Sequence, residues 1–249
     1  MALFNTPTLL GGQAAKAGLS CASCHVNGRD NPHFLLPSLS GATGTADVTS
    51  SFFSAARGNG ARDPVRIPDL AKPGKIFRTQ DDKALEQFIR NLVVEEFSGN
   101  EPSPATLSAI SSYVRSIRLC ADGDDVQKDR RLRDQIDLID AALDGAAAMQ
   151  QRGDTPSAKL LIASARHQLG LISERFVAKR FAIERKLLLD ASRSLLAIAE
   201  ADNGALIVAP LDLWRKDFNR KLIPRLVAGQ PRSLYNKRHV VAALGDRAQ

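Results

Sequence analysis

The chain has 249 residues, of which 44% are hydrophobic and 24% charged, and a formal net charge of +7. This composition is typical of one or two globular domains with apolar cores, and it excludes a disordered chain. No stretch approaches the roughly 18 consecutive apolar residues of a membrane span.

The most informative motif is the run CASCH at residues 21–25. A C-x-x-C-H run is typical of covalent c-type haem attachment, because two thiols two residues apart can each add to a haem vinyl group and the next imidazole can bind the iron. We therefore predict one covalent haem c, held by Cys21 and Cys24, with His25 as the proximal iron ligand.

Two other kinds of protein site also contain a C-x-x-C pair, a zinc site and a thioredoxin-like redox pair. A zinc site needs a second pair of ligands, and the one further cysteine is Cys120. A thioredoxin-like redox pair belongs near a βαβ pattern, which is not visible here. Cys120 itself is expected to be a buried, inert thiol, with a reactive thiol or pairing between chains as the alternatives.

Residues 1–121 are predicted to form a compact, mainly helical haem domain with long loops, because glycine, proline, serine and threonine are frequent between Gly28 and Gly74. Helices are expected over residues 13–17, 48–56, 81–97 and 104–117. In the third of these, one apolar stripe consists of Leu85, Phe88, Ile89, Leu92 and Val93.

Residues 122–249 are predicted to form a second domain, a long antiparallel helical hairpin or bundle. Its first helix has a seam of Leu132, Ile136, Ile139, Leu143 and Ala146. After a turn at residues 153–156, one helix is expected from residue 156 to about 201, although Gly170 weakens that prediction. Further helices are expected over residues 211–226 and 233–244. The fold class is therefore all-α.

The positive charge is concentrated at the C-terminal end, where residues 203–249 carry nine basic and three acidic side chains. Such a surface can attract an acidic redox partner protein, a membrane complex or an anionic surface, and the plainer alternative is a solvated helix face. Nucleic acid is not an expected partner. The basic residues expected to form this contact surface are Arg215, Lys216, Arg220, Lys221 and Arg225.

The N-terminal part resembles bacterial di-haem cytochrome c peroxidases and their relatives that oxidise methylamine dehydrogenase precursors. The matching segments are LF at 3–4, LLGG at 9–12, GLSCASCH at 18–25 and, more weakly, VRIPDL at 65–70 and residues 109–117. The resemblance implies a cytochrome c-like fold with the same roles for the motif residues. The chain departs from that family in having one haem motif, and in lacking a methionine or histidine in the loop at residues 74–79.

The sixth iron ligand stays open at this point. His33 is the distal candidate nearest the motif, and its alternative is a surface-loop histidine. Met149, His167 and His239 reach the iron only if the helical part folds over the haem. Further possibilities are Lys72, Lys75 or an open coordination position.

The expected function is that of a monohaem c-type cytochrome that transfers electrons in an extracytoplasmic redox chain, with the helical part docking a partner. A periplasmic location is expected, with a signal peptide removed. One alternative is a peroxidase-like haem enzyme with an open distal site, for which Glu95 and Glu96 are the acidic pair to inspect, an exposed helix end being their plainer role. The other is a structural haem subunit of a respiratory or photosynthetic complex.

Overall fold

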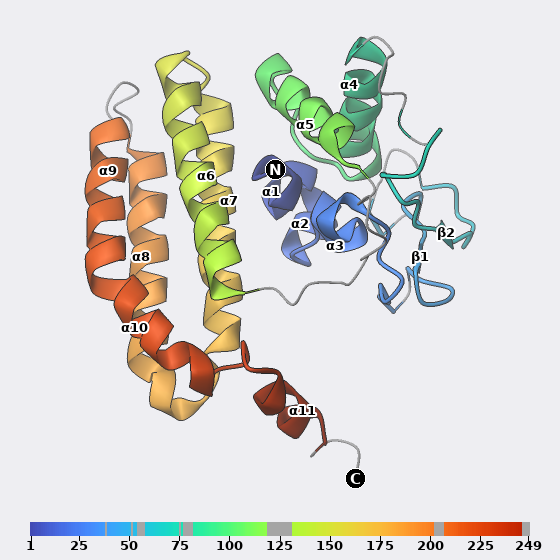
Figure 1. Ribbon diagram of the computed structural model, residues 1–249. Helices are drawn as coiled ribbons and strands as arrows, with labels where there is room; N and C mark the ends of the chain where they lie inside the picture. The colour runs from blue at the N-terminus through green and yellow to red at the C-terminus, as the bar shows by residue number, and fades with distance from the viewer. Residues whose placement is uncertain are drawn as a thin grey trace. The chain divides into compact units, whose positions relative to one another are not determined.

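The computed structural model describes residues 1–37, 39–50, 52–53, 58–74, 76, 82–118, 131–201 and 207–245. These residues are mostly helical, as the sequence predicts (Figure 1). The chain divides into two compact units, Met1–Val126 and Gln127–Gln249. The boundary predicted at residue 121 and the thiol of Cys120 both lie outside the described residues.

The first unit combines short helices with a long irregular segment. Its described α-helices are α1 (Pro7–Leu10), α2 (Gly12–Lys16), α3 (Cys21–Cys24), α4 (Asp82–Asn91) and α5 (Pro104–Ser116). Short 3₁₀ turns occur at Leu3–Asn5 and Val26–Gly28. In the irregular segment, β1 (Thr45–Ala46) pairs antiparallel with β2 (Val65–Arg66).

The helix predicted over residues 48–56 is wrong for the residues described there, which form turns and bends. Asp47 explains the difference, because its carboxylate accepts hydrogen bonds from the backbone N–H of Thr49 at 3.1 Å and from the Thr49 hydroxyl at 3.0 Å. Such a local side-chain bond competes with the first turn of a helix. Phe53 is nevertheless buried and packs edge-to-face on Phe97, with 5.3 Å between ring centroids.

The helices predicted over residues 81–97 and 104–117 are confirmed for their described residues. A π-helical turn at Leu92–Glu96 extends α4. Ser103 begins α5, since its hydroxyl accepts a hydrogen bond from the N–H of Thr106 at 3.1 Å, and Pro104 occupies the first turn, where a missing N–H costs nothing.

Gly11 and Gly99 allow the end of α1 to pack directly on the chain that follows the π-helical turn. Gly11 has φ +70°, and a Cβ atom there would lie 2.5 Å from the Cα of Gly99. A Cβ on Gly99 would lie 2.6 Å from the carbonyl oxygen of Leu10. Neither position has room for a side chain, so two backbones meet here without one between them.

The second unit is built from longer helices. They are α6 (Leu132–Gln151), α7 (Thr155–Arg175), α8 (Ala182–Glu200), α9 (Val208–Asp217), α10 (Ile223–Gly229) and α11 (Lys237–Gly245). The predicted seam of α6 is confirmed, because all five of its residues are buried. The predicted restart after residue 153 is confirmed as well, and Asp154 caps α7 by accepting a hydrogen bond from the N–H of Ser157 at 3.1 Å.

The single helix predicted from residue 156 to about 201 is wrong, because the chain turns between α7 and α8. Gly170 lies inside α7, so it does not cause the break. The turn is built around Phe176 and Phe181, which are buried and pack edge-to-face at 5.0 Å. The Arg175 carbonyl also accepts a hydrogen bond from the N–H of Leu234 at 2.8 Å, so the turn depends on a distant segment.

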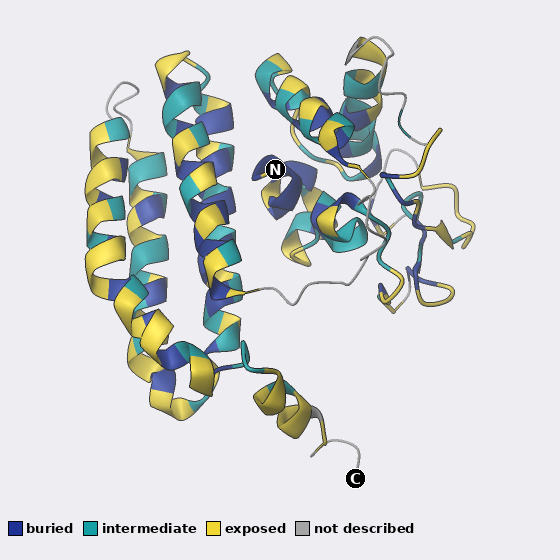
Figure 2. Cartoon of the chain, viewed as in Figure 1, coloured by how far each residue is buried: buried dark blue, intermediate teal, exposed yellow. Residues whose placement is uncertain are grey.

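The turn also changes which residues of α8 are buried. Ile183, near the start of α8, is 62% exposed, whereas Leu188 and Leu195 are buried. Four helices lie side by side in this unit (Figure 1): α6 contacts α7, α7 contacts α8, α8 contacts α9, and α9 contacts α6. Their buried positions form stripes along the helices (Figure 2). None of the described helices is both long and apolar enough to cross a membrane.

Candidate cofactor site

Helix α3 brings the three residues of the motif together. Cys21 and Cys24 are three residues apart on one helical turn, which places both thiols on the same face. The N–H of His25 donates to the Cys21 carbonyl at 2.8 Å, so the imidazole follows directly on that turn. The Ser20 N–H donates to the Ser23 hydroxyl at 3.0 Å and holds the start of the turn.

These three residues line an apolar cavity in the first unit. Its empty space, part of which is open to solvent, amounts to about 970 Å³. Among the residues that the structure describes, the lining side chains other than Ser20, Cys21, Cys24 and His25 are hydrocarbon. They are Phe4, Leu10, Leu19, Phe34, Ala46, Val48, Phe53, Leu70, Ile76, Leu85, Phe88, Ile89, Leu92, Val93, Phe97, Ile110 and Val114.

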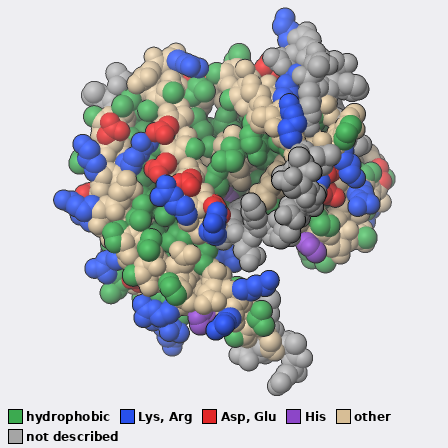
Figure 3. Space-filling view, in the orientation of Figure 1, with side chains coloured by type: hydrophobic (Ala, Val, Ile, Leu, Met, Phe, Trp, Pro, Cys, Tyr) green, Lys and Arg blue, Asp and Glu red, His purple; other side chains and the backbone are tan. Residues whose placement is uncertain are grey.

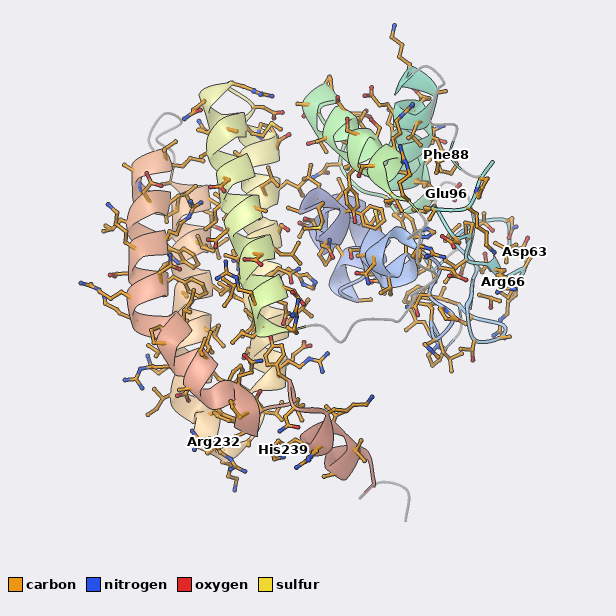
Figure 4. The ribbon with its side chains drawn as sticks, viewed as in Figure 1. Asp63, Arg66, Phe88, Glu96, Arg232 and His239 are labelled. Carbon is orange, nitrogen blue, oxygen red and sulfur yellow. The ribbon has the colours of Figure 1, made fainter. Side chains whose placement is uncertain are left out.

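The predicted apolar stripe of α4 forms part of this lining, because all five of its residues contribute to it. Ile110 and Val114 of α5 lie on the same cavity. Phe88 lines the cavity and is also 60% exposed, so the cavity reaches the surface at α4 (Figure 4).

Burial makes the two thiols weak acids. Desolvation raises the pKa of Cys21 to about 12, with a smaller contribution from Cys24, and it raises the pKa of Cys24 to about 11. A thiol–disulfide exchange pair needs a thiolate, which a lowered pKa supplies. The arrangement therefore disfavours the thioredoxin-like alternative for this C-x-x-C pair.

Burial favours the neutral form of the His25 imidazole. Burial lowers its pKa, and the backbone of Arg29 and Pro68 together with the charges of Asp69 and Asp30 oppose that effect without cancelling it. Nδ1 of the ring is buried without a hydrogen bond of good geometry to the described residues. A neutral imidazole with a buried nitrogen suits a metal ligand, since only the unprotonated nitrogen can bind iron.

The segment after the motif is fastened to the stretch at residues 65–70. Arg29 donates two hydrogen bonds to Asp69, from Nε at 2.8 Å and from Nη2 at 2.7 Å. The Asn31 side chain donates to the Ser23 carbonyl at 2.8 Å, which ties the loop to α3. These contacts position Leu70, which lines the cavity, relative to His25.

The distal candidates that the structure describes do not line this cavity. His33 is exposed and is not among the cavity-lining residues, and its backbone N–H donates to the Asn31 side chain at 3.2 Å. Lys72 is likewise exposed and does not line the cavity, and Lys75 lies outside the described residues. Met149, His167 and His239 belong to the second unit (Figure 4 labels His239 on α11).

Glu95 and Glu96 are also absent from the cavity lining. Glu95 lies 3.7 Å from the Arg90 guanidinium, with 37% of its side chain exposed. Glu96 is buried, with 6% of its surface exposed, so the expectation of an exposed helix end is wrong for this residue (Figure 4). The π-helical turn causes the difference, because its wider spacing rotates Glu96 relative to an α-helix.

The five basic residues singled out in the C-terminal segment differ in their surroundings. Arg215 is only 27% exposed and pairs with Asp144 at 2.8 Å and Asp140 at 3.8 Å, both on α6. Arg220 and Lys221 both pair with Asp217. Lys216 and Arg225 are exposed, with no ion pair to a described residue within 4.0 Å. Figure 3 shows Lys and Arg spread over this unit's visible face, with Asp and Glu among them.

Sequence reasoning missed most of the cavity wall. Phe34 and Ala46 of the irregular segment, together with Ile67, form a buried cluster on which Leu19 and Cys24 pack. The only signal for these residues is that they are isolated apolar positions within a loop, a pattern without a period that marks burial.

Among the residues that the structure describes, no group of three or more His, Cys, Asp or Glu side chains could hold a metal ion by itself. No known protein family, curated protein or solved structure matches the chain.

Proposed function

We propose that the first unit is a cytochrome c-like domain carrying one covalent haem c, and that the protein transfers electrons in an extracytoplasmic redox chain. Cys21 and Cys24 would hold the haem through thioether bonds, and His25 would bind the iron. The second unit, a helical hairpin extended into a bundle, would dock the partner.

One observation carries this proposal: the two thiols and the imidazole of a C-x-x-C-H motif line one cavity, and the other described residues of its wall, apart from Ser20, are hydrocarbon. A porphyrin is a large apolar ring, and its burial against such walls is strongly favourable. The donor set fits as well, since two thiols and one neutral imidazole are what covalent attachment and axial ligation require.

When bound, a c-type haem iron cycles between its ferrous and ferric states at a potential set by its axial ligands, burial and local hydrogen bonds. The chain's own residues would contribute in two ways. The hydrocarbon walls would exclude water, and the opening at Phe88 would let an electron donor or acceptor approach the buried group.

A peroxidase-like activity receives less support. General acid or base catalysis needs a titratable side chain within hydrogen-bonding reach of the bound peroxide. His25 is the only acid or base among the described lining residues besides the weakly acidic thiols, and it is assigned to the iron. Glu95 and Glu96 do not reach the cavity lining.

For the docking of a partner, Lys216 and Arg225 are the better candidates among the five basic residues, because they are exposed and Arg215 is engaged with α6. An exposed positive charge accelerates encounter with an acidic partner and loses its effect at high salt. The third alternative, a structural haem subunit, would use the same surface.

Expression with the bacterial c-type haem maturation system tests the haem assignment. The protein should retain haem on a denaturing gel and give the pyridine haemochrome spectrum of two thioether bonds. A redox titration should then show one reversible one-electron step. A chain that emerges from the same cells without covalent haem would contradict the proposal.

The chain supplies its own control for this experiment. Cys21→Ala together with Cys24→Ala should abolish covalent attachment, whereas Cys120→Ala, which changes the one cysteine outside the motif, should leave it unchanged. If all three changes reduced haem content equally, the thiols of the motif would have no special role.

A further inference from the structure

We infer that the second unit carries a binding site for a phosphate group, formed by Arg180, Arg225 and Arg232 where α10 packs against the turn between α7 and α8. The three side chains line one hollow, and its empty space, part of which is open to solvent, amounts to about 520 Å³. Figure 4 labels Arg232 at this end of the unit. The site lies within the second unit and does not depend on the proposed haem.

Buried contacts fix the backbone on both sides of the hollow. Gly229 is buried, and a Cβ atom there would lie 2.9 Å from the Phe176 ring and 3.2 Å from the Phe181 ring. Because Gly229 has no side chain, α10 can approach the turn this closely. The Arg175 carbonyl accepts a hydrogen bond from the N–H of Leu234 at 2.8 Å, which holds the segment after α10 on the same turn.

The three guanidinium groups reach the hollow from two segments that are distant in the sequence. Arg180 belongs to the 3₁₀ turn Lys179–Phe181, which precedes α8. On the other side, α10 continues directly into a 3₁₀ turn at Gln230–Arg232. The lining residues there follow at spacings of three, one and three, which is one face of a helix; they are Arg225, Ala228, Gly229 and Arg232.

The three arginines differ from other basic residues of this unit in their charge partners. Arg215 pairs with Asp144, and Arg220 pairs with Asp217. Arg180, Arg225 and Arg232 are exposed and have no ion pair with a described residue within 4.0 Å. Like charges that line one hollow repel one another, and a bound anion removes that repulsion.

The charge of the lining indicates the class of anion. Glu184 is the one acidic side chain among the described lining residues, and its Oε2 is buried without a hydrogen bond from a described residue. Three guanidinium groups and one carboxylate give the lining a net charge of +2. A phosphate monoester carries a charge close to −2 at pH 7, so it balances this lining.

The shape of the anion supports the same class. A phosphate monoester presents three terminal oxygen atoms, each of which can accept hydrogen bonds, whereas a carboxylate presents two oxygen atoms and one charge. The planar guanidinium group matches phosphate through paired hydrogen bonds. Three such groups around one hollow therefore favour a terminal phosphate, whether on a small soluble molecule or on a lipid headgroup.

The test uses the full-length protein and isothermal titration calorimetry in a buffer without phosphate. The probe is glycerol 3-phosphate, and glycerol is the uncharged comparison. We expect one molecule of glycerol 3-phosphate to bind per chain with a dissociation constant below about 1 mM, and glycerol not to bind. A titration without saturable binding of glycerol 3-phosphate overturns the inference.

Variants of the arginines test the location of the site. Arg225→Gln and Arg232→Gln should each weaken binding by at least about tenfold, because each removes charged hydrogen-bond donors. Arg193→Gln is the matched control, since Arg193 of α8 is 70% exposed and does not line the hollow. It also removes one positive charge, and it should change the affinity by less than about twofold.

Equal weakening by Arg232→Gln and Arg193→Gln would show a general attraction to positive charge and would overturn the site. The variants Arg225→Gln and Arg232→Gln are independent, so a folding defect in one leaves the other to decide.

A variant of Glu184 has the opposite expected sign. Glu184→Gln removes the negative charge from the lining and should strengthen the binding of glycerol 3-phosphate by at least about threefold. Weaker binding by this variant would contradict an anion in the hollow.

Sedimentation with vesicles identifies the source of the phosphate. The vesicles contain phosphatidylcholine with or without phosphatidic acid, whose headgroup is a phosphate monoester. If glycerol 3-phosphate binds and Arg232→Gln reduces binding to phosphatidic acid vesicles where Arg193→Gln does not, the site takes a lipid headgroup. If glycerol 3-phosphate binds and the vesicles do not, the site takes a soluble molecule. A chain without covalent haem would contradict the proposed function and leave this site intact.

Discussion

Arg29 and Asp69 form a two-pronged ion pair across forty residues of sequence, with Nε 2.8 Å from Oδ1 and Nη2 2.7 Å from Oδ2. The Asp69 carboxylate is buried, with 3% of its side chain exposed, and it also accepts a hydrogen bond from the N–H of Ala71 at 2.9 Å. The pair fastens the segment after the C-x-x-C-H motif to the stretch that contributes Leu70 to the cavity.

Asp69→Asn should lower the free energy of unfolding of the first unit by about 2 kcal/mol, because it removes a charged hydrogen-bond partner and leaves the Arg29 guanidinium, which is 21% exposed, without its carboxylate. Urea denaturation followed by far-ultraviolet circular dichroism measures the loss. Fluorescence of Trp214, the only tryptophan, reports on the second unit and should not change.

Asp63→Asn is the matched control for this change. Asp63 is exposed beside β2 (Figure 4), and its hydrogen bonds to Thr49 and Asn59 are long, at 3.4 Å. The Asp63→Asn substitution should lower the free energy of unfolding by less than about 0.5 kcal/mol. Equal losses in the two variants would show that the Arg29 pair has no special importance.

The stabilising effect of Asp69 should depend on pH. The hydrogen bonds from Arg29, above all, hold the pKa of Asp69 below its ordinary value in the folded state. A carboxylate whose pKa is lowered by folding stabilises the protein above the unfolded pKa of about 3.9 and loses that effect as the pH falls through the folded pKa.

The difference in unfolding free energy between the unchanged protein and Asp69→Asn should therefore be constant from pH 7 to about pH 5 and shrink below about pH 4. Denaturation curves for both proteins across this range provide the measurement. A difference that grew as the pH fell would contradict the assignment of the lowered pKa.

Gly99→Ala should destabilise the first unit by roughly 1 to 3 kcal/mol. A Cβ atom at this position would lie 2.6 Å from the Leu10 carbonyl oxygen and 2.7 Å from that of Leu9, so backbone must move to admit it. Thermal or urea unfolding of the full chain, followed by circular dichroism, gives the size of the effect.

Gly170→Ala is a control with the opposite expected sign. Gly170 lies inside α7, in its last third, at an exposed position, and a Cβ atom there would meet nothing within 4 Å. Alanine should stabilise the second unit by about 0.5 to 1 kcal/mol, because glycine loses more backbone freedom in a helix. Destabilisation by both substitutions would undermine the steric argument for Gly99.

Arg215→Gln should destabilise the second unit by roughly 0.5 to 1 kcal/mol, because it removes the ion pairs that join α9 to Asp140 and Asp144 of α6. Arg220→Gln is the matched control, since Arg220 is 74% exposed and, among the described residues, its ion pair is with Asp217, three residues before it. Trp214 fluorescence during urea denaturation measures both. A larger loss in Arg220→Gln would contradict this distinction.

Much of the secondary structure could be predicted because its causes are local. Pro104 and Asp154 mark helix starts through capping and a fixed backbone angle, and the stripe of α4 follows from helical spacing. The break between α7 and α8 could not be predicted, because it depends on contacts with distant residues. Phe176 packs 6.0 Å from Tyr235, and a Cβ on Gly229 would lie 2.9 Å from the Phe176 ring.

The sequence by itself determined the chemistry-bearing residues, because Cys21, Cys24 and His25 have their meaning through spacing along a single turn. Only the tertiary structure decided what surrounds them. Apart from the stripe of α4, the cavity wall comes from side chains between Phe4 and Val114 that share no period, and His33, close to the motif in sequence, stays exposed. The spacing of residues along the chain predicts which of them share one face of a helix or strand. Packing between elements decides which residues from other parts of the chain contact that face.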